Sequence, residues 1–168
     1  MKKFIALFSL VLLSYSSFAQ SKIGTIDAEY ILTQLPEMTD VNEGMKTYNE
    51  ELQKELETTI TNYETLVKDY QENNTTFSEE DRKTKESEII SLENDIKSFR
   101  QKASVMMQMR RNELTKPLYD KINEAMQQVI KEDNYTHIFH AGGNALAFAE
   151  AESDITEKVM AKLGIVQQ

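Results

Sequence analysis

The sequence has no cysteine, no tryptophan, two prolines and five glycines among its 168 residues. Without cysteine the chain forms no disulfide, no zinc–thiolate site, no cysteine nucleophile and no lipid-modified cysteine. So few glycines and prolines disfavour turn-rich β-sandwiches and barrels, and also the glycine-rich loops that bind nucleotides. Basic residues are scarce too, since 19 Lys and Arg stand against 28 Asp and Glu, a net charge of −9. Because phosphate binding depends on Lys and Arg, we expect no nucleic-acid partner.

The first nineteen residues have the pattern of a secretory signal peptide. Lys2 and Lys3 precede an apolar run over residues 4–13, and the small Ser17 and Ala19 occupy the positions that a signal peptidase reads. The alternative is a membrane anchor, but the uncharged stretch is shorter than the roughly 20 residues of a spanning helix. We therefore expect residues 1–19 to be cleaved, leaving 17 basic and 28 acidic residues. The mature chain is then exported, carries a net charge of about −11 and has no stable membrane insertion.

The start of the mature chain predicts a strand followed by a short helix. Residues 22–27 are apolar on both faces, as a buried strand tends to be. Asp27 is predicted to cap a helix over residues 28–35, which ends at Pro36.

The end of the chain predicts two more strands and a last helix. Residues 135–140 and 145–149 are predicted strands, joined by a hairpin turn at Gly142, Gly143 and Asn144. A final helix begins near Thr156 and takes Gly164 as its C-terminal cap. The first strand must meet this hairpin to form one core.

The middle of the chain predicts a long antiparallel helical hairpin. Between Val41 and Tyr70 the apolar residues recur about every 3.6 residues, the period of an amphipathic helix. Ser78 and three following acidic residues then predict the start of a second helix, which is expected to reach Asp133. From Ile89 the apolar residues alternate three- and four-residue spacings, as in a heptad seam.

These elements divide the mature chain into a body and an insertion. Residues 20–40 and 117–168 form the predicted body, and residues 41–116 form the predicted hairpin. The body has roughly 70 residues, a size at which a single core is marginal, so we expect it to oligomerise. The expected fold class is α+β and mostly α, with a small β-rich body and a coiled-coil-like hairpin.

Several short motifs, taken in their order and spacing, resemble the Skp/OmpH family of periplasmic chaperones. They are Lys22–Asp27 with Pro36–Glu37, Phe77–Arg82, Pro117–Ile122, Asn134–Phe139, Asn144–Ala149 and Asp154–Thr156. The resemblance covers nearly all of the mature chain. It implies a periplasmic homotrimer in which a β-rich trimerisation body carries three helical tentacles. The cavity between the tentacles would hold unfolded outer-membrane proteins, without ATP or any other cofactor.

The resemblance and the apolar pattern together name candidate residues for two surfaces. The predicted trimerisation residues lie on the strands of the body: Ile23, Ile26, Ile138, Phe139, Leu146 and Phe148. The predicted client-contact residues lie on the apolar faces of the hairpin: Tyr63, Val67, Ile96, Phe99 and Met106. The neighbouring methionines 106, 107 and 109 fit a flexible contact surface and a packed core equally well.

The well-known members of the family are basic, and this chain departs from them. Its one compact basic cluster in the long helix comprises Arg110, Arg111 and Lys116. An ordinary solvated helix face, pairing with nearby Glu113, explains that cluster better than a lipopolysaccharide site does. The acidic balance therefore favours apolar contact with clients over electrostatic capture.

No residue pattern points to an enzyme. His137 and His140 are the only histidines, and on a strand they point to opposite faces, so we expect no shared metal ion. The remaining alternative to a chaperone is a passive coiled-coil spacer or adaptor in the cell envelope. Strict Leu and Ile seams would favour the spacer, whereas Tyr48, Tyr63 and Met106 interrupt the seam here and favour the chaperone.

Overall fold

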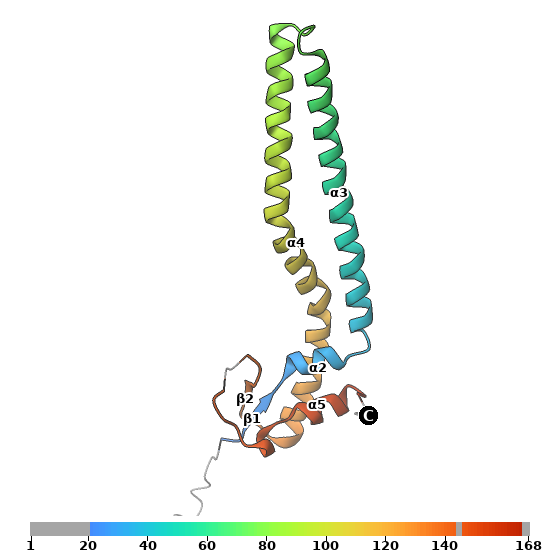
Figure 1. Ribbon diagram of the computed structural model, residues 1–168. Coiled ribbons are helices and arrows are strands. Elements are labelled where there is room, and N and C mark those ends of the chain that lie inside the picture. The colour runs from blue at the N-terminus through green and yellow to red at the C-terminus, as the bar shows by residue number, and fades with distance from the viewer. Residues whose placement is uncertain (1–20, 144–145, 166–168) are drawn as a thin grey trace, which may run out of the picture. The chain divides into compact units, whose positions relative to one another are not determined.

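The computed structural model describes residues 21–143 and 146–165 of the chain. Helices dominate, and one small sheet accompanies them (Figure 1). In chain order the elements are β1 (Ile23–Ile26), α2 (Ala28–Gln34), α3 (Met38–Asn73), α4 (Glu79–Asp133), β2 (His137–His140), the 3₁₀ turn η1 (Ala151–Ser153) and α5 (Thr156–Lys162). The predicted signal peptide lies outside the described residues.

The chain forms two compact units, and each is considered by itself. The terminal unit contains the residues up to Ile31 and those from Ile122 onward, and the hairpin unit is Leu32–Lys121. Both α2 and α4 contribute residues to the two units. The functional boundaries predicted at residues 40 and 117 stay a prediction.

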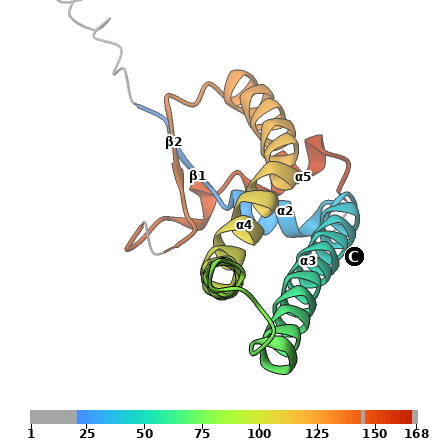
Figure 2. The ribbon, with the colours of Figure 1, turned by 90° about the horizontal axis from the view of Figure 1, so that it is seen from above.

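In the terminal unit, the first strand meets the strand predicted after residue 135. β1 and β2 lie side by side and pair in parallel, with Ile23 opposite His137 and Ile26 opposite His140 (Figures 1 and 2). A parallel pair cannot be closed by a tight turn, because both strands run the same way and the chain must return between them. The long helical segment between β1 and β2 makes that return. The predicted contact between the first strand and the strand after residue 135 is therefore confirmed.

The other edge of β1 is occupied by the segment before α5. Thr25 pairs with Asp154 in an isolated parallel bridge, and the backbone N–H of Ile155 donates to the carbonyl of Thr25 at 2.8 Å. The Thr156 hydroxyl accepts a hydrogen bond from the Asp27 backbone N–H at 2.9 Å. β1 is therefore held on both sides by the C-terminal part of the chain.

The terminal unit has its own apolar core. Helical spacing on α4 places Ile122, Ala125 and Val129 on one buried face, and the same spacing on α5 buries Val159. The other fully or nearly buried side chains of this unit are Ile26, Ala28, Ile31, Tyr135, Ile155 and Met160.

The end of α5 confirms the cap predicted at Gly164. Its φ of +74° is a left-handed conformation that glycine adopts without a steric penalty. The N–H of Gly164 donates to the carbonyl of Ala161, and the N–H of Ile165 donates to the carbonyl of Met160. These two bonds form a Schellman motif, which satisfies carbonyls that the last helical turn leaves free.

The strand predicted over residues 145–149 is wrong for the residues that the structure describes. Residues 146–150 belong to no strand, and η1 follows them. Asn144 of the predicted turn and Ala145 lie outside the described residues. Alanine, which is depleted in strands, occupies alternate positions of this segment, and none of the described residues pairs with the outer edge of β2.

The hairpin unit is formed by α3 and the first part of α4, which run antiparallel. The predicted cap is confirmed, because the backbone N–H of Asp81 donates to the Ser78 hydroxyl at 3.1 Å. Gly44 and Leu114 lie near the open end of the hairpin, the end opposite the turn between α3 and α4. A Cβ added to Gly44 would lie 3.1 Å from a methyl group of Leu114. Glycine therefore permits a close approach of the two helices at this point.

Gly24 in β1 is expected to tolerate no larger residue without a loss of stability. A Cβ at this position would lie 2.8 Å from Cδ1 of Ile138 and 3.0 Å from the ring of Tyr135. We predict that Gly24→Ala lowers the free energy of unfolding by about 1 kcal/mol, the lower end of the cost of overpacking. Urea unfolding followed by circular dichroism measures it.

Gly142→Ala is the matched control for this substitution. The nearest atoms to a Cβ there are at 3.8 Å or more, which is ordinary contact. Its unfolding free energy should stay unchanged or rise slightly, because alanine restricts the unfolded chain. Equal effects of the two substitutions would contradict the packing argument.

Candidate functional site

The hairpin unit leaves many apolar side chains partly open to solvent. The five client-contact candidates Tyr63, Val67, Ile96, Phe99 and Met106 are all half-buried. Two antiparallel helices cover only the facing stripe of one another, so side chains at the margins of the stripe stay accessible. Their burial fits a role in contact, but their assignment to clients stays a prediction.

Three further apolar residues of α4 are more exposed than any of these candidates. Ile90, Val105 and Met109 are 58%, 57% and 66% exposed. Ile90 directly follows the seam residue Ile89, and Val105 directly precedes the seam residue Met106. Apolar residues next to the seam were the signal that the sequence interpretation missed. Large apolar side chains standing clear of the seam are available to a partner.

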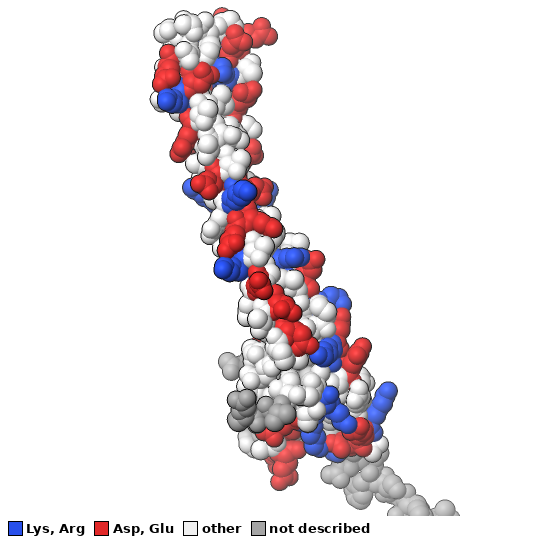
Figure 3. Space-filling model, turned by 90° about the vertical axis from the view of Figure 1, so that its right-hand side faces the viewer, with Lys and Arg blue, Asp and Glu red and all other residues white. Residues whose placement is uncertain are grey.

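The charged residues do not form a single binding patch on the face shown in Figure 3, where acidic and basic side chains are mixed along the hairpin and uncharged surface lies between them. Many are paired one helical turn apart, as in the pairs Lys46–Glu50, Lys68–Glu72 and Lys116–Asp120. Exposed pairs of this kind contribute little to stability. They keep the polar face solvated.

Two of the five candidate residues each line a cleft between α3 and α4. Met106 lines a cleft of about 510 Å³ together with Tyr48, Met109, Arg110 and Glu113. Phe99 lines a second cleft of about 380 Å³, whose other lining residues are Glu55, Thr59, Asn62, Leu92, Asp95, Ser98 and Lys102. Tyr63, Val67 and Ile96 are not among the lining residues of either cleft. The first cleft is the more apolar of the two.

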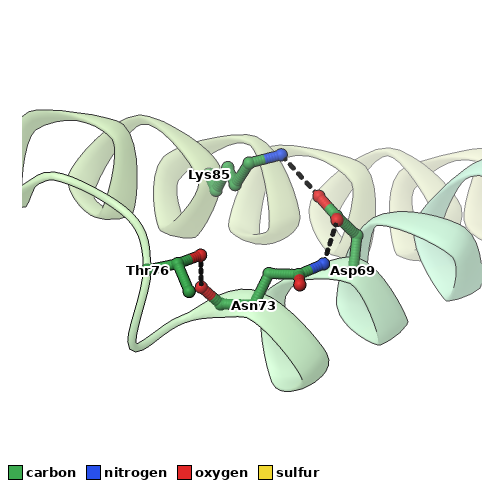
Figure 4. A network of polar contacts seen from close by, with 4 residues as sticks. All are labelled: Asp69, Asn73, Thr76 and Lys85. Carbon is green, nitrogen blue, oxygen red and sulfur yellow. Dashed lines mark hydrogen bonds and ion pairs between the residues drawn. The ribbon is translucent and has the colours of Figure 1, made fainter.

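The turn of the hairpin is held by a network of polar contacts (Figure 4). Lys85 of α4 reaches across to Asp69 of α3, with Nζ 2.7 Å from Oδ2. The amide of Asn73 donates to the other oxygen of Asp69 at 2.9 Å, and the Thr76 hydroxyl donates to the backbone carbonyl of Asn73. Lys85 also lies 5.0 Å from the centre of the Phe77 ring, within range of a cation–π contact. These contacts fix the two helices against each other at this end.

The ion pairs of the hairpin shift the pKa values of their members. A hydrogen bond from Lys85, and to a lesser extent one from Asn73, lowers the pKa of Asp69. The bond between Lys85 and Asp69 also raises the pKa of Lys85. Tyr70 donates a hydrogen bond to Glu86, which raises the pKa of the phenol. At the other end of the hairpin, a hydrogen bond from Lys121 lowers the pKa of Glu37. The carboxylates of Asp69 and Glu37 therefore contribute most to stability when they are ionised.

The middle of α3 is intrinsically weaker than its ends. Four threonine hydroxyls donate to the carbonyl four residues earlier at 2.8 to 3.0 Å, those of Thr58, Thr59, Thr61 and Thr65. Threonine has a low helix propensity, and this pattern of bonding slightly destabilises and bends helices. The clefts therefore lie along a hairpin whose ion pairs between distant residues, Lys85–Asp69 and Lys121–Glu37, are at its two ends.

The predicted trimerisation residues of the terminal unit differ widely in exposure. Ile26 is 1% exposed and belongs to the core of its own unit, so little of its surface is free for a partner. Ile23, Phe139 and Phe148 are 50%, 48% and 81% exposed. Ile138 and Leu146 are half-buried. Ile23, Phe139 and Phe148 are therefore the members of this set with the most surface for a partner subunit to cover.

The histidines and carboxylates of the described residues do not converge. Nδ1 of His137 lies 3.0 Å from the Thr136 hydroxyl. No group of three or more His, Asp or Glu side chains among the described residues is arranged to hold a metal ion. None of the described helices contains an apolar segment long enough to cross a membrane.

The Asp69–Lys85 pair is expected to make the hairpin sensitive to acid. The pKa of Asp69 is lower in the folded chain than in the unfolded chain, so its contribution is present above the unfolded pKa and is lost as pH falls through the folded value. We predict that Asp69→Asn lowers the melting temperature near neutral pH and that the difference from the wild type narrows as pH falls below the ordinary Asp pKa of about 3.9. Glu79→Gln, which breaks a pair within α4 at the same end, should have a smaller effect. Melting curves from pH 7 to pH 3 that stay equally far apart for Asp69→Asn would contradict this.

The comparisons with known proteins agree with this architecture. A structure from Caulobacter crescentus CB15, described as an OmpH-like outer membrane chaperone, is similar with a TM-score of 0.62 and 17% identity, covering 86% of this chain and 85% of that one. At this identity the likeness shows the fold. No curated protein sequence matches the chain. The model of the OmpH-like outer membrane protein family matches residues 22–163, nearly all of the residues that the structure describes, and the chain belongs to that family.

Proposed function

We propose that this protein is a periplasmic holdase chaperone, which binds unfolded outer-membrane proteins without ATP and prevents their aggregation. The observation that carries the proposal is the exposure of large apolar side chains along the hairpin, above all Ile90, Val105 and Met109. Membership of the OmpH-like family and a structural neighbour described as a chaperone support it.

Reversible apolar contact suits such a function. Burial of apolar surface is favourable and non-directional, so one surface serves many client sequences. A chaperone that binds the unfolded chain lowers its free concentration by mass action, and aggregation slows accordingly. The net charge of about −11 expected for the mature chain makes electrostatic capture of acidic clients unfavourable, which leaves apolar contact as the source of affinity.

A passive spacer in the envelope is less consistent with these side chains. A spacer needs a seam that buries its apolar residues, because exposed ones invite aggregation. In the hairpin unit Val41 and Leu52 are buried, whereas the residues named above stand open to solvent. The holdase explains that exposure and the spacer does not.

The proposal includes assembly into a homotrimer through the terminal unit. Its sheet has two four-residue strands, and such a small sheet is marginal by itself. Phe139 and Phe148 are exposed on this unit, and burying them against other subunits would add apolar area to a small core. Three hairpins from one body would then surround a client.

The hairpin is expected to be the holding element. We predict that deleting Met45–Glu113 and joining the ends with a short Gly/Ser linker abolishes the suppression of client aggregation. The join is short because Gly44 and Leu114 already approach each other closely. The measurement is light scattering after a urea-unfolded outer-membrane β-barrel is diluted into buffer with the wild type, with the truncated chain or with neither.

Circular dichroism and the size of the truncated chain are the controls for its folding. If the truncated chain folds and protects the client as well as the full chain does, the hairpin is not the holding element. If the full chain does not reduce scattering at any ratio, the holdase proposal itself is wrong.

The assembly is tested at its most exposed aromatic residue. We predict that Phe148→Asp shifts the wild-type trimer toward monomers at micromolar concentration, because burying an unpaired charge in an interface costs several kcal/mol. Ile90→Asp makes a similar change on the hairpin and should leave the oligomeric state unchanged. Size-exclusion chromatography with multi-angle light scattering measures both, and a monomeric wild type would end the assembly proposal.

A further inference from the structure

The cleft at the open half of the hairpin unites apolar walls with a single guanidinium group. Tyr48 of α3 faces Met106, Met109, Arg110 and Glu113 of α4, and the cleft between them measures about 510 Å³. That volume lies within the range of small ligand sites, about 300 to 1,000 Å³. The α4 residues recur at three- and four-residue spacings, so they share one face of the helix.

Arg110 is held in this cleft by two partners. Its Nη1 donates to Oε2 of Glu113 at 2.7 Å, and its Cζ lies 5.8 Å from the centre of the Tyr48 ring. Its Nε is buried and has no hydrogen-bond partner among the described residues. A buried donor without an acceptor costs free energy, so the side chain gains from any rearrangement that brings an acceptor to it.

The charges of the cleft decide which acceptor fits. The guanidinium is already neutralised by Glu113, so the pair offers no net positive charge to an anion. A phosphate or carboxylate entering the cleft would meet the Glu113 carboxylate at close range, and like charges repel. A peptide carbonyl is neutral, accepts hydrogen bonds and meets no such repulsion.

We infer that this cleft binds one apolar side chain of an unfolded client, with the neighbouring backbone carbonyl of the client accepting a hydrogen bond from Arg110. The inference rests on the proposed holdase function and names the part of the hairpin where a client is anchored. Each unfolded chain presents free carbonyls beside apolar side chains, so the site selects for an exposed apolar residue and not for a sequence.

The methionines explain how such a site accepts side chains of different shape. Methionine is unbranched and polarisable, and it adapts to irregular neighbours. Both methionines belong to the α4 wall of the cleft. Met109 is 66% exposed and has room to change its side-chain conformation, whereas Met106 is half-buried and more tightly packed. Aromatic and aliphatic client residues are therefore expected to bind with similar affinity.

The test compares two pairs of substitutions that remove similar apolar area from α4. Met106→Ala with Met109→Ala empties the cleft wall, whereas Ile90→Ala with Val105→Ala removes exposed side chains that do not line the cleft. We expect the Kd for a dye-labelled, urea-unfolded β-barrel to rise about tenfold for the first pair and only about threefold for the second, whose side chains contact clients outside the cleft. Equal losses for the two pairs would overturn the cleft and leave the holdase proposal standing, whereas a wild type that does not bind the barrel would overturn that proposal.

Arg110→Lys and Glu113→Gln separate the carbonyl from an anion. Lysine keeps the charge but loses Nε and the planar fork, so Arg110→Lys should weaken client binding without changing the melting temperature. Glu113→Gln removes the negative charge, and a tenfold gain in client affinity would show that an anionic group binds Arg110 and would overturn the inference. A further test offers the wild type anionic or neutral phospholipid vesicles. If it binds the anionic vesicles more tightly and these vesicles displace the client, an anion occupies the cleft and the inference is overturned.

A tryptophan in the cleft gives a readout that does not depend on loss of affinity. The chain has no tryptophan, so Tyr48→Trp introduces a single fluorophore that keeps an aromatic ring beside Arg110. The probe is a capped, uncharged Gly/Ser peptide with one Phe, and its control has Ala in place of Phe. Saturable blue-shifted emission with the Phe peptide alone supports the inference, and no shift up to millimolar peptide contradicts it.

Discussion

Two antiparallel helices cover each other along a single stripe, and this limit shapes the whole hairpin unit. Each helix is wide enough to carry apolar side chains on both sides of the contact line, but the partner helix reaches only the centre of that face. Val41 and Leu52 are buried, whereas Ile90, Val105 and Met109 remain exposed. A compact globular domain would bury such residues under a third layer. Here the shortage of covering surface leaves exposed the apolar side chains on which the proposed chaperone function depends.

The hairpin compensates for its thin apolar contact with polar cross-links at its ends. Lys85–Asp69 lies beside the turn, and Lys121–Glu37 joins α4 to the residue before α3 at the opposite end. Between them the threonines of α3 weaken the helix, and the clefts lie beside this weaker stretch or between it and the open end. Ties at both ends keep the two helices in register, while the middle keeps side chains that can adjust. An adaptable surface on a defined frame is what a binder of varied unfolded chains requires.

The sequence predicts the elements well where a local signal decides them. Period and capping place the second helix at Glu79–Asp133, and glycine at position 164 marks the end of α5, because these features depend on neighbours within a few residues. Residues 146–149 show the opposite case. Their apolar composition suggested a strand, but a strand exists only with a partner edge, and composition alone does not provide one. The parallel sense of the β1–β2 pair was likewise beyond reach, because it depends on how the chain returns over more than a hundred residues.

The candidate site shows the same division between local pattern and distant contact. Met106 was found because it lies on the apolar period, whereas the cleft around it depends on Tyr48, which lies 58 residues earlier on another helix. Arg110 was expected to pair with nearby Glu113 on a solvated face, and the pair forms, but it lies in a mostly apolar cleft. The ion pair could be predicted because Glu113 lies one turn away on the same helix, whereas the cleft could not, because Tyr48 belongs to the other helix. Under the proposed function, a neutral cleft avoids repulsion of acidic clients where contact is closest, and the negative charge on the solvated faces disfavours self-association.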